Sequence, residues 1–126
     1  MYNLERALER LEEALEQEAN PLAIDGTIQR FEFVIELFWK TLKRLLTLEG
    51  IQTFTPKETL QAAYTAHWLE DENIWLQMLS DRNKTSHIYD EEMACRIYNK
   101  LQTYYDELDL TYKFLKNRFQ NELHGR

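Results

Sequence analysis

The sequence predicts an all-α fold, an up-and-down antiparallel bundle of about five helices that forms a single domain over residues 1–126. Only 3 Gly and 2 Pro occur in the chain, which leaves few places to break a helix and argues against a turn-rich sandwich or barrel. Apolar residues recur every three or four positions along most of the chain, which is the helical period. A chain of this length buries roughly two-thirds of the surface that its unfolded form exposes, enough for one core.

The first two helices are expected on either side of Asn20-Pro21, which interrupts the apolar pattern. The first covers residues 3–18, with Glu residues on its solvated faces. Its apolar stripe consists of Leu4, Leu8, Leu11 and Leu15. The second is longer and central, because its apolar stripe is broad. Asp25 can cap its start, and it runs to Glu49, where Gly50 can end it in a left-handed conformation.

Two shorter helices and one long one are expected next. Thr55-Pro56-Lys57-Glu58 is a strong start signal, because it supplies a Thr cap, Pro at the first helical position and Glu three residues after the cap. That helix should reach about His67, and Asp71 or Glu72 should open the fourth. The last helix starts near Asp90 and is expected to continue as one element to the tail, with its end extended towards a partner.

Composition excludes several classes of protein. The net charge of −7 argues against a general nucleic-acid binder, and no DNA partner is expected, although residues 96–126 carry six Lys or Arg against four Asp or Glu. The single cysteine, Cys95, excludes an internal disulfide, and we interpret it as a small buried side chain. No apolar run approaches the ~18 residues of a membrane span, and the charged N-terminus is unlike a signal peptide, so a cytoplasmic protein is expected.

The sequence lacks the common motifs for phosphate and metal binding. It has no glycine-rich phosphate loop, no His-Glu-x-x-His and no EF-hand loop. His67 and Asp71 lie four residues apart, but two ligands do not make a metal site. We therefore expect no metal and no cofactor. The tyrosines at positions 98, 104, 105 and 112 are expected in the core or an interface rather than on a base-stacking platform.

One segment, residues 81–90, combines side chains that suit catalysis. Arg82 extends the apolar face of the fourth helix, where an uncompensated charge is costly. On a regular helix, His87 would point about 140° away from Arg82. The two side chains therefore converge only if the helix ends near Thr85 or Ser86, which the start signal that follows makes reasonable.

A neutral imidazole at His87 can act as a general base near pH 7, and the guanidinium of Arg82 can hold a phosphate or stabilise developing negative charge. Together they suit metal-free cleavage of RNA, in which a base activates the ribose 2′-hydroxyl against the adjacent phosphodiester. Tyr89 adds a phenol hydroxyl two residues further on. The alternative is structural: Arg82 pairs with a carboxylate, Asp81 or Asp90 being candidates, while His87 caps a turn.

The motif Arg82-Asn83-x3-His87-x-Tyr89 resembles the Arg-x4-His-x-Tyr signature of HEPN domains, in which a polar residue follows the Arg. Residues 31–43 and 75–90 are similar to one branch of that family. This branch is the nucleotidyltransferase substrate-binding protein family, the HEPN partner in toxin–antitoxin pairs with a minimal nucleotidyltransferase (MNT). The likeness covers about residues 3–110.

The resemblance implies a homodimer, or a higher oligomer, in which the motifs of two subunits face one composite cleft. It implies a metal-independent endoribonuclease, with Arg82 and His87 carrying the activity and Asn83 supporting them. It also implies an MNT antitoxin that transfers AMP from ATP onto Tyr89 and silences the toxin. The older family name implies an alternative, a non-enzymatic subunit that presents a substrate or nucleotide to the nucleotidyltransferase, which the net charge favours. A third hypothesis is a structural dimer whose motif has drifted.

Overall fold

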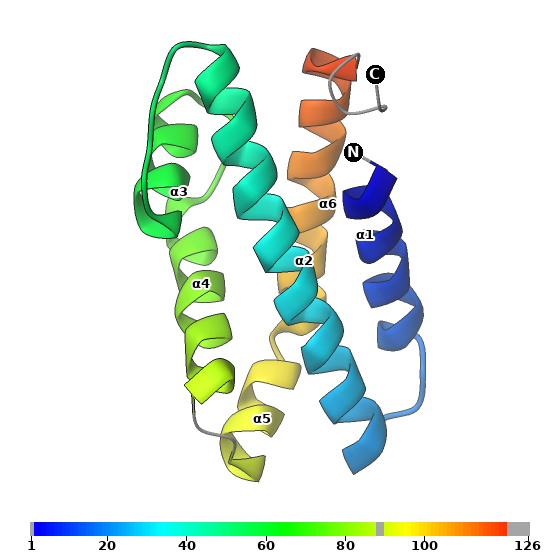
Figure 1. Cartoon of the computed structure of the whole chain (residues 1–126). Coiled ribbons are helices and arrows are strands. Elements are labelled where there is room, and N and C mark those ends of the chain that lie inside the picture. The colour runs from blue at the N-terminus through cyan, green and yellow to red at the C-terminus, as the bar shows by residue number, and fades with distance from the viewer. Residues whose placement is uncertain (1, 88–89, 121–126) are drawn as a thin grey trace.

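Our computed structural model describes residues 2–87 and 90–120 of the chain, and within them the side chains of all but residues 2, 86 and 87. Over these residues the protein has six α-helices and no strand, which confirms the all-α prediction. The helices are α1 Tyr2–Leu15, α2 Pro21–Leu48, α3 Pro56–Thr65, α4 Glu72–His87, α5 Glu91–Tyr98 and α6 Leu101–Arg118. Figure 1 shows the long helices running up and down, with α2 crossing in front of α6. The α4 helix lies on one side of this pair and α1 lies on the other.

The second helix begins earlier than the sequence predicts. Asn20 is its N-cap, with the side-chain oxygen accepting a hydrogen bond from the Ala23 amide at 2.9 Å, and Pro21 occupies the first helical turn. The predicted start at Asp25 is therefore wrong, and α1 ends at Leu15 rather than at residue 18. Asn20-Pro21 therefore starts the second helix and does not end the first, because Asn caps as well as Asp and Pro has the φ angle of a first helical turn.

The other end of α2 follows the prediction. Gly50 has a φ of 84°, in the left-handed region. Its amide donates to the Thr47 carbonyl at 3.0 Å, and the Ile51 amide donates to the Leu46 carbonyl at 2.8 Å. This is a Schellman motif, which satisfies carbonyls that the helix end would leave without partners.

Two more predicted caps are confirmed. The Thr55 hydroxyl accepts from the Glu58 amide at 3.1 Å, and the Glu58 carboxylate accepts from the Phe54 amide at 2.8 Å. The Thr and Glu side chains of the capping signal therefore each accept a hydrogen bond from a backbone amide at the start of α3. The Asp71 carboxylate accepts from the Ile74 amide at 3.2 Å at the start of α4.

The last predicted helix is two helices. Asp90 caps α5 as predicted, accepting from the Glu92 amide at 2.8 Å. The helix then breaks at residues 99–100, where the Lys100 ammonium contacts the buried Asp81 carboxylate at 2.8 Å. Ile97 and Leu101 are both buried, so the apolar stripe continues across the break and periodicity gives no sign of it.

The core lies between α2 and the other helices. Phe31 of α2 stacks on Tyr104 of α6 with ring centroids 5.5 Å apart, and Phe38 meets Trp75 of α4 edge to face at 4.9 Å. The four predicted tyrosines are buried or pack against this core. Cys95, in contrast, is exposed, and its interpretation as a buried side chain is wrong, because the inward stripe of α5 carries Ala94 and Ile97 instead.

The end of α6 packs on the bundle. The Phe119 ring meets Trp68 edge to face at 5.2 Å, and the Arg118 guanidinium contacts the Glu49 carboxylate at 3.2 Å. The chain up to Phe119 therefore does not extend away from the bundle, and residues 121–126 lie outside the described residues. Across the described part of the chain, none of the helices combines the length and apolar character needed to cross a membrane.

Candidate functional site

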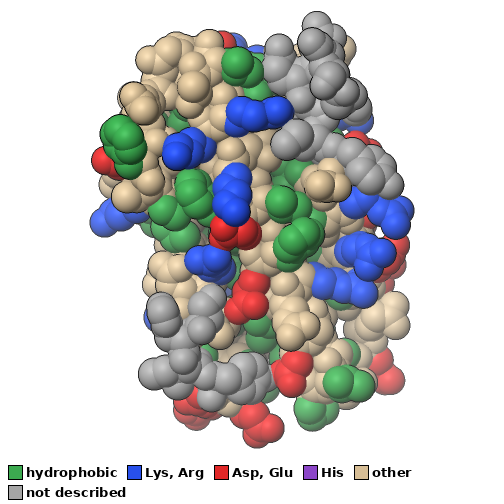
Figure 2. Space-filling view, in the orientation of Figure 1, with side chains coloured by type: hydrophobic (Ala, Val, Ile, Leu, Met, Phe, Trp, Pro, Cys, Tyr) green, Lys and Arg blue, Asp and Glu red, His purple; other side chains and the backbone are tan. Residues whose placement is uncertain are grey.

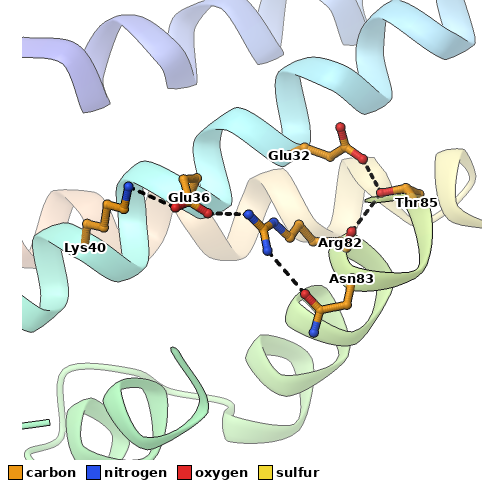
Figure 3. Close-up of polar contacts among 6 residues, drawn as sticks. All are labelled: Glu32, Glu36, Lys40, Arg82, Asn83 and Thr85. Carbon is orange, nitrogen blue, oxygen red and sulfur yellow. Dashed lines mark hydrogen bonds and ion pairs between the residues drawn. The ribbon is translucent and has the colours of Figure 1, made fainter. Parts of the chain in front are cut away.

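The candidate site lies where α2 and α4 pass each other. Glu32 and Glu36 occur four residues apart on α2, so they lie one turn apart on the same face of that helix. Arg82 and Thr85 occur three residues apart on α4 and face them. Figure 3 shows the two acidic side chains pointing across the interhelical space at this pair. The helix spacing thus places two carboxylates opposite a guanidinium and a hydroxyl.

The Arg82 guanidinium has partners on both helices. One terminal nitrogen, Nη2, donates to Glu36 Oε1, and the other, Nη1, donates to the neighbouring Asn83 Oδ1 at 3.3 Å. The Arg82 side chain is 28% exposed, so it lies at the edge of the core and not within it. The structure therefore brings together two of the predicted residues, Arg82 and Asn83.

The carboxylate that compensates Arg82 is not one of the two proposed from the sequence. Glu36, 46 residues earlier in the chain, is the partner that the structure shows. Asp81 points into the core, and Asp90 caps α5. Sequence reasoning missed Glu36 because the pair is formed between helices, although the spacing of Glu32 and Glu36 beside the apolar stripe of α2 was a usable signal.

Glu36 is held ionised by its neighbours. The Lys40 ammonium contacts Glu36 Oε2 at 3.0 Å, one helical turn away on α2. The hydrogen bond from Lys40 is the largest cause that lowers the pKa of Glu36, partial burial opposes it, and the Arg82 charge lowers the pKa further. The carboxylate therefore links Lys40 to Arg82.

Thr85 fixes the second carboxylate. Its hydroxyl donates to Glu32 Oε2 and also lies 3.0 Å from the Arg82 carbonyl, one turn back on α4. A hydroxyl can donate only one proton, so these two acceptors share it. Glu32 and Thr85 thus form a second cross-link between α2 and α4, next to the Arg82–Glu36 pair (Figure 3).

Directly behind the site, Asp81 anchors α4 to the break between α5 and α6. It is 2% exposed, and its Oδ2 accepts from the Tyr104 hydroxyl at 2.5 Å and from the Lys100 ammonium at 2.8 Å. Burial, the hydrogen bond to Asp81 and the Asp81 charge raise the pKa of Tyr104 well above its usual range, so this phenol stays protonated. Gln77 accepts from the same hydroxyl at 3.1 Å.

Two predicted site residues are not tested by side-chain geometry. The α4 helix ends at His87, next to the predicted end near Thr85 or Ser86. The His87 side chain and the whole of Tyr89 lie outside the described residues.

Charged side chains surround the site on the face that α2 presents. Figure 2 shows Lys and Arg side chains over the front of the molecule, with acidic side chains between them. The basic residues in the second half of α2 are Lys40, Lys43 and Arg44. Over the described residues, no group of three or more His, Cys, Asp or Glu side chains could hold a metal ion.

Comparison with known proteins identifies relatives of this chain. It is 34% identical over 102 residues to a protein of Haemophilus influenzae named probable ribonuclease HepT, covering 77% of this chain and 70% of that protein. A crystal structure of a Thermus thermophilus protein superposes with a TM-score of 0.84 at 33% identity, covering 90% of this chain and 98% of that one.

A second solved structure, from Haemophilus influenzae, superposes with a TM-score of 0.77 at 28% identity and covers 90% of this chain and 97% of that one. It is described as revealing the fold of a substrate binding domain of a nucleotidyltransferase. Residues 1–117 match the family described as nucleotidyltransferase substrate binding protein like. This match covers nearly the whole chain and agrees with the motif, so the chain belongs to the nucleotidyltransferase substrate binding protein like family of HEPN-like proteins.

Proposed function

We propose that this protein is the HEPN toxin of an MNT–HEPN toxin–antitoxin pair and a metal-independent endoribonuclease. The observation that carries the proposal is the Arg82 guanidinium, which Glu36 and Asn83 hold at the partly exposed edge of α4, five residues before His87. The name of the Haemophilus influenzae relative, probable ribonuclease HepT, supports the same activity.

The roles follow from the chemistry of each group. His87, as a neutral imidazole, would take the proton of a ribose 2′-hydroxyl. The 2′-oxygen would then attack the adjacent phosphorus, the bond from phosphorus to the 5′-oxygen of the next nucleotide would break, and that oxygen would take a proton from water. Arg82 would stabilise the negative charge that develops on the phosphoryl oxygens, and Asn83 would orient its guanidinium. The products would be a 2′,3′-cyclic phosphate and a 5′-hydroxyl.

Silencing by the partner would act on the same segment. The Tyr89 phenol would attack the α-phosphorus of ATP in the MNT partner, release pyrophosphate and become an adenylylated tyrosine. The modification adds a negative charge and a bulky adenosine two residues from His87, where an RNA phosphate has to bind. We propose that the protein works as a homodimer, with two such sites facing one cleft.

The activity test uses purified chain and a mixture of tRNA and mRNA in EDTA. Wild-type protein should cleave RNA and leave cyclic-phosphate ends, and expression of the chain alone should stop growth. His87→Ala should lose both effects while keeping the same helical content and the same dimer mass in light scattering. His67→Asn is the matched control, because it removes a histidine at an exposed position whose φ of 67° suits Asn. Intact RNA with well-folded wild-type protein would contradict the proposal.

The modification test uses the MNT partner and ATP labelled on the α-phosphate. The wild-type chain should gain one AMP and lose its nuclease activity, whereas Tyr89→Phe should gain none and stay active. Tyr98→Phe, on α5, is the control for loss of a phenol elsewhere. If the Tyr89→Phe variant still gained one labelled AMP, Tyr89 would not be the modified residue.

A second function is supported by the relative described as a substrate binding domain of a nucleotidyltransferase. In this alternative the chain is not an enzyme and presents a substrate or nucleotide to its partner. The net charge of −7 favours it, because RNA has to approach an acidic protein. The activity test separates the two functions, since a binding subunit would leave RNA intact at any concentration of folded protein.

A further inference from the structure

Two hollows meet on the side of α4 that faces α3 and α5. One, of about 670 Å³, is lined by apolar Leu76, Leu79 and Met93 together with polar and charged side chains that include Asn83. The other, of about 480 Å³, is lined mainly by polar and charged side chains. Lys84 and Met93 line both, so the hollows adjoin. Asn83, the hydrogen-bond partner of Arg82, places the first hollow next to the candidate site.

The second hollow is cationic, unlike the protein as a whole. Its lining carries Lys84, Arg96 and Lys100 against one acid, Asp81, in a chain whose net charge is −7. Lys100 lies 2.8 Å from Asp81, whereas Lys84 lies at 3.9 Å and is largely exposed. Arg96 is also largely exposed, with a long 3.6 Å contact to Glu92 on its own helix. Exposed pairs of this kind are weak, so both side chains are available to an anion.

The first hollow has a different chemistry. Its apolar side chains form a surface that an unstacked nucleobase could contact with its faces. The Asn83 amide and the Ser80 hydroxyl offer hydrogen-bond donors and acceptors, and Lys57 and Asp90 add one charge of each sign to the lining. Single-stranded RNA is recognised by such a combination of pockets for splayed bases and cations along the backbone.

We propose that the two hollows form one binding track for single-stranded RNA, with backbone phosphates at Lys84 and Arg96 and a base in the apolar hollow beside Asn83. The inference rests on the proposed ribonuclease function. It specifies the side of the molecule from which the RNA substrate reaches the candidate site. The track is on the α4–α5 side of the molecule and does not use the basic residues in the second half of α2, Lys40, Lys43 and Arg44.

The proposed contacts with backbone phosphates are tested by the salt dependence of RNA binding. A fluorescent single-stranded RNA is titrated with full-length His87→Ala protein between 50 and 300 mM salt, so that cleavage does not interfere. The substitutions Lys84→Gln and Arg96→Gln each remove one positive charge. Each should reduce the magnitude of the slope of log K against log salt by about 0.7, the value for one phosphate contact on a single strand. Lys113→Gln should leave the slope unchanged. It removes the same charge from an exposed i,i+4 pair with Asp109 on α6.

The proposed binding of a base is tested by filling the apolar hollow with a larger side chain. Ser80 is exposed on α4 and lines that hollow, so Ser80→Phe would occupy it without removing a core contact. The variant should bind the same RNA about tenfold more weakly, because the phenyl ring takes the apolar surface that the base would bury, with an unchanged salt slope. Thr103→Phe, at an exposed position of α6, is the control for adding a phenyl ring and should bind like the parent.

Three results would overturn the track. The first is no measurable RNA binding by His87→Ala protein. The second is a slope that falls with Lys43→Gln on α2 but not with the α4 and α5 variants. The third is a change of dimer mass with Ser80→Phe, which would mean that a second copy of the chain covers the hollow. If wild-type protein cleaves RNA and none of the track variants matters, the track fails and the function stands. If variants alter binding but RNA is never cleaved, the function fails and the track stands.

Discussion

Asp81 and Arg82 are neighbours in the sequence, yet they belong to two different networks. Asp81 points inward and is surrounded by Tyr104 and Lys100, so its charge is compensated inside the core. Arg82 points to the edge, where Glu36 and Asn83 bind part of its guanidinium. A network centred on a buried carboxylate holds helices together. A partly exposed one positions a cation that solvent, and hence a substrate, can reach.

The largest expected effect is on the buried network. Asp81→Ala should lower the free energy of unfolding by about 3 kcal/mol, because it leaves the Tyr104 hydroxyl and the Lys100 ammonium without their buried acceptor. Urea unfolding followed by circular dichroism measures this directly. Tyr104→Phe is the milder companion, expected at about 1 kcal/mol for one hydrogen bond. A loss below 1 kcal/mol for Asp81→Ala would mean that water replaces the network and that α4 is held by apolar contacts alone.

A smaller effect on stability is expected at the edge. Arg82→Ala should cost about 1 kcal/mol or less, since its pair with Glu36 is partly exposed. The same substitution should abolish RNA cleavage if the proposed function is right, so stability and activity separate at this residue. Urea midpoints and cleavage rates from one preparation test both. A loss of stability as large as that of Asp81→Ala would place Arg82 in the structural network instead.

The smallest expected effect is the contribution of Glu36 to the pH dependence of folding stability. Its pKa is lowered in the folded protein, so the stabilisation is present above the unfolded-state pKa of about 4.3 and is lost as pH falls through the lower folded value. Glu36→Gln should therefore flatten the fall of the urea midpoint as the pH drops below about 5. Glu58→Gln changes an acid that accepts from the Phe54 amide at the start of α3, and it serves as the comparison. Parallel curves for wild type and Glu36→Gln would show that Arg82 and Lys40 do not act on this carboxylate.

The sequence predicted those features that depend on neighbouring residues. The caps at Thr55, Asp71 and Asp90 and the left-handed Gly50 are local, because the side chain and the backbone groups it satisfies lie within a few positions. The helical stripes are local in the same sense, and they gave the fold class and the core.

Features that depend on distant residues were missed. The break between α5 and α6 has no Gly or Pro, and it lies where Lys100 meets Asp81, a contact formed only in the folded bundle. The pairing of Arg82 with Glu36 spans 46 residues, so no window of sequence contains both. The start of α2 is a different case, since two adequate caps, Asn20 and Asp25, compete and the first one is used.

The contact of Glu36 with both Lys40 and Arg82 has a consequence for the entropy of binding. A long arginine side chain that is free in solution loses rotamer freedom when a ligand orders it, at a cost of about 2 kcal/mol. Here Glu36 and Asn83 restrict the Arg82 rotamer before any ligand arrives. An anion that reaches the exposed part of the Arg82 side chain therefore meets a preorganised cation, and part of that ordering cost is met by folding instead of by binding.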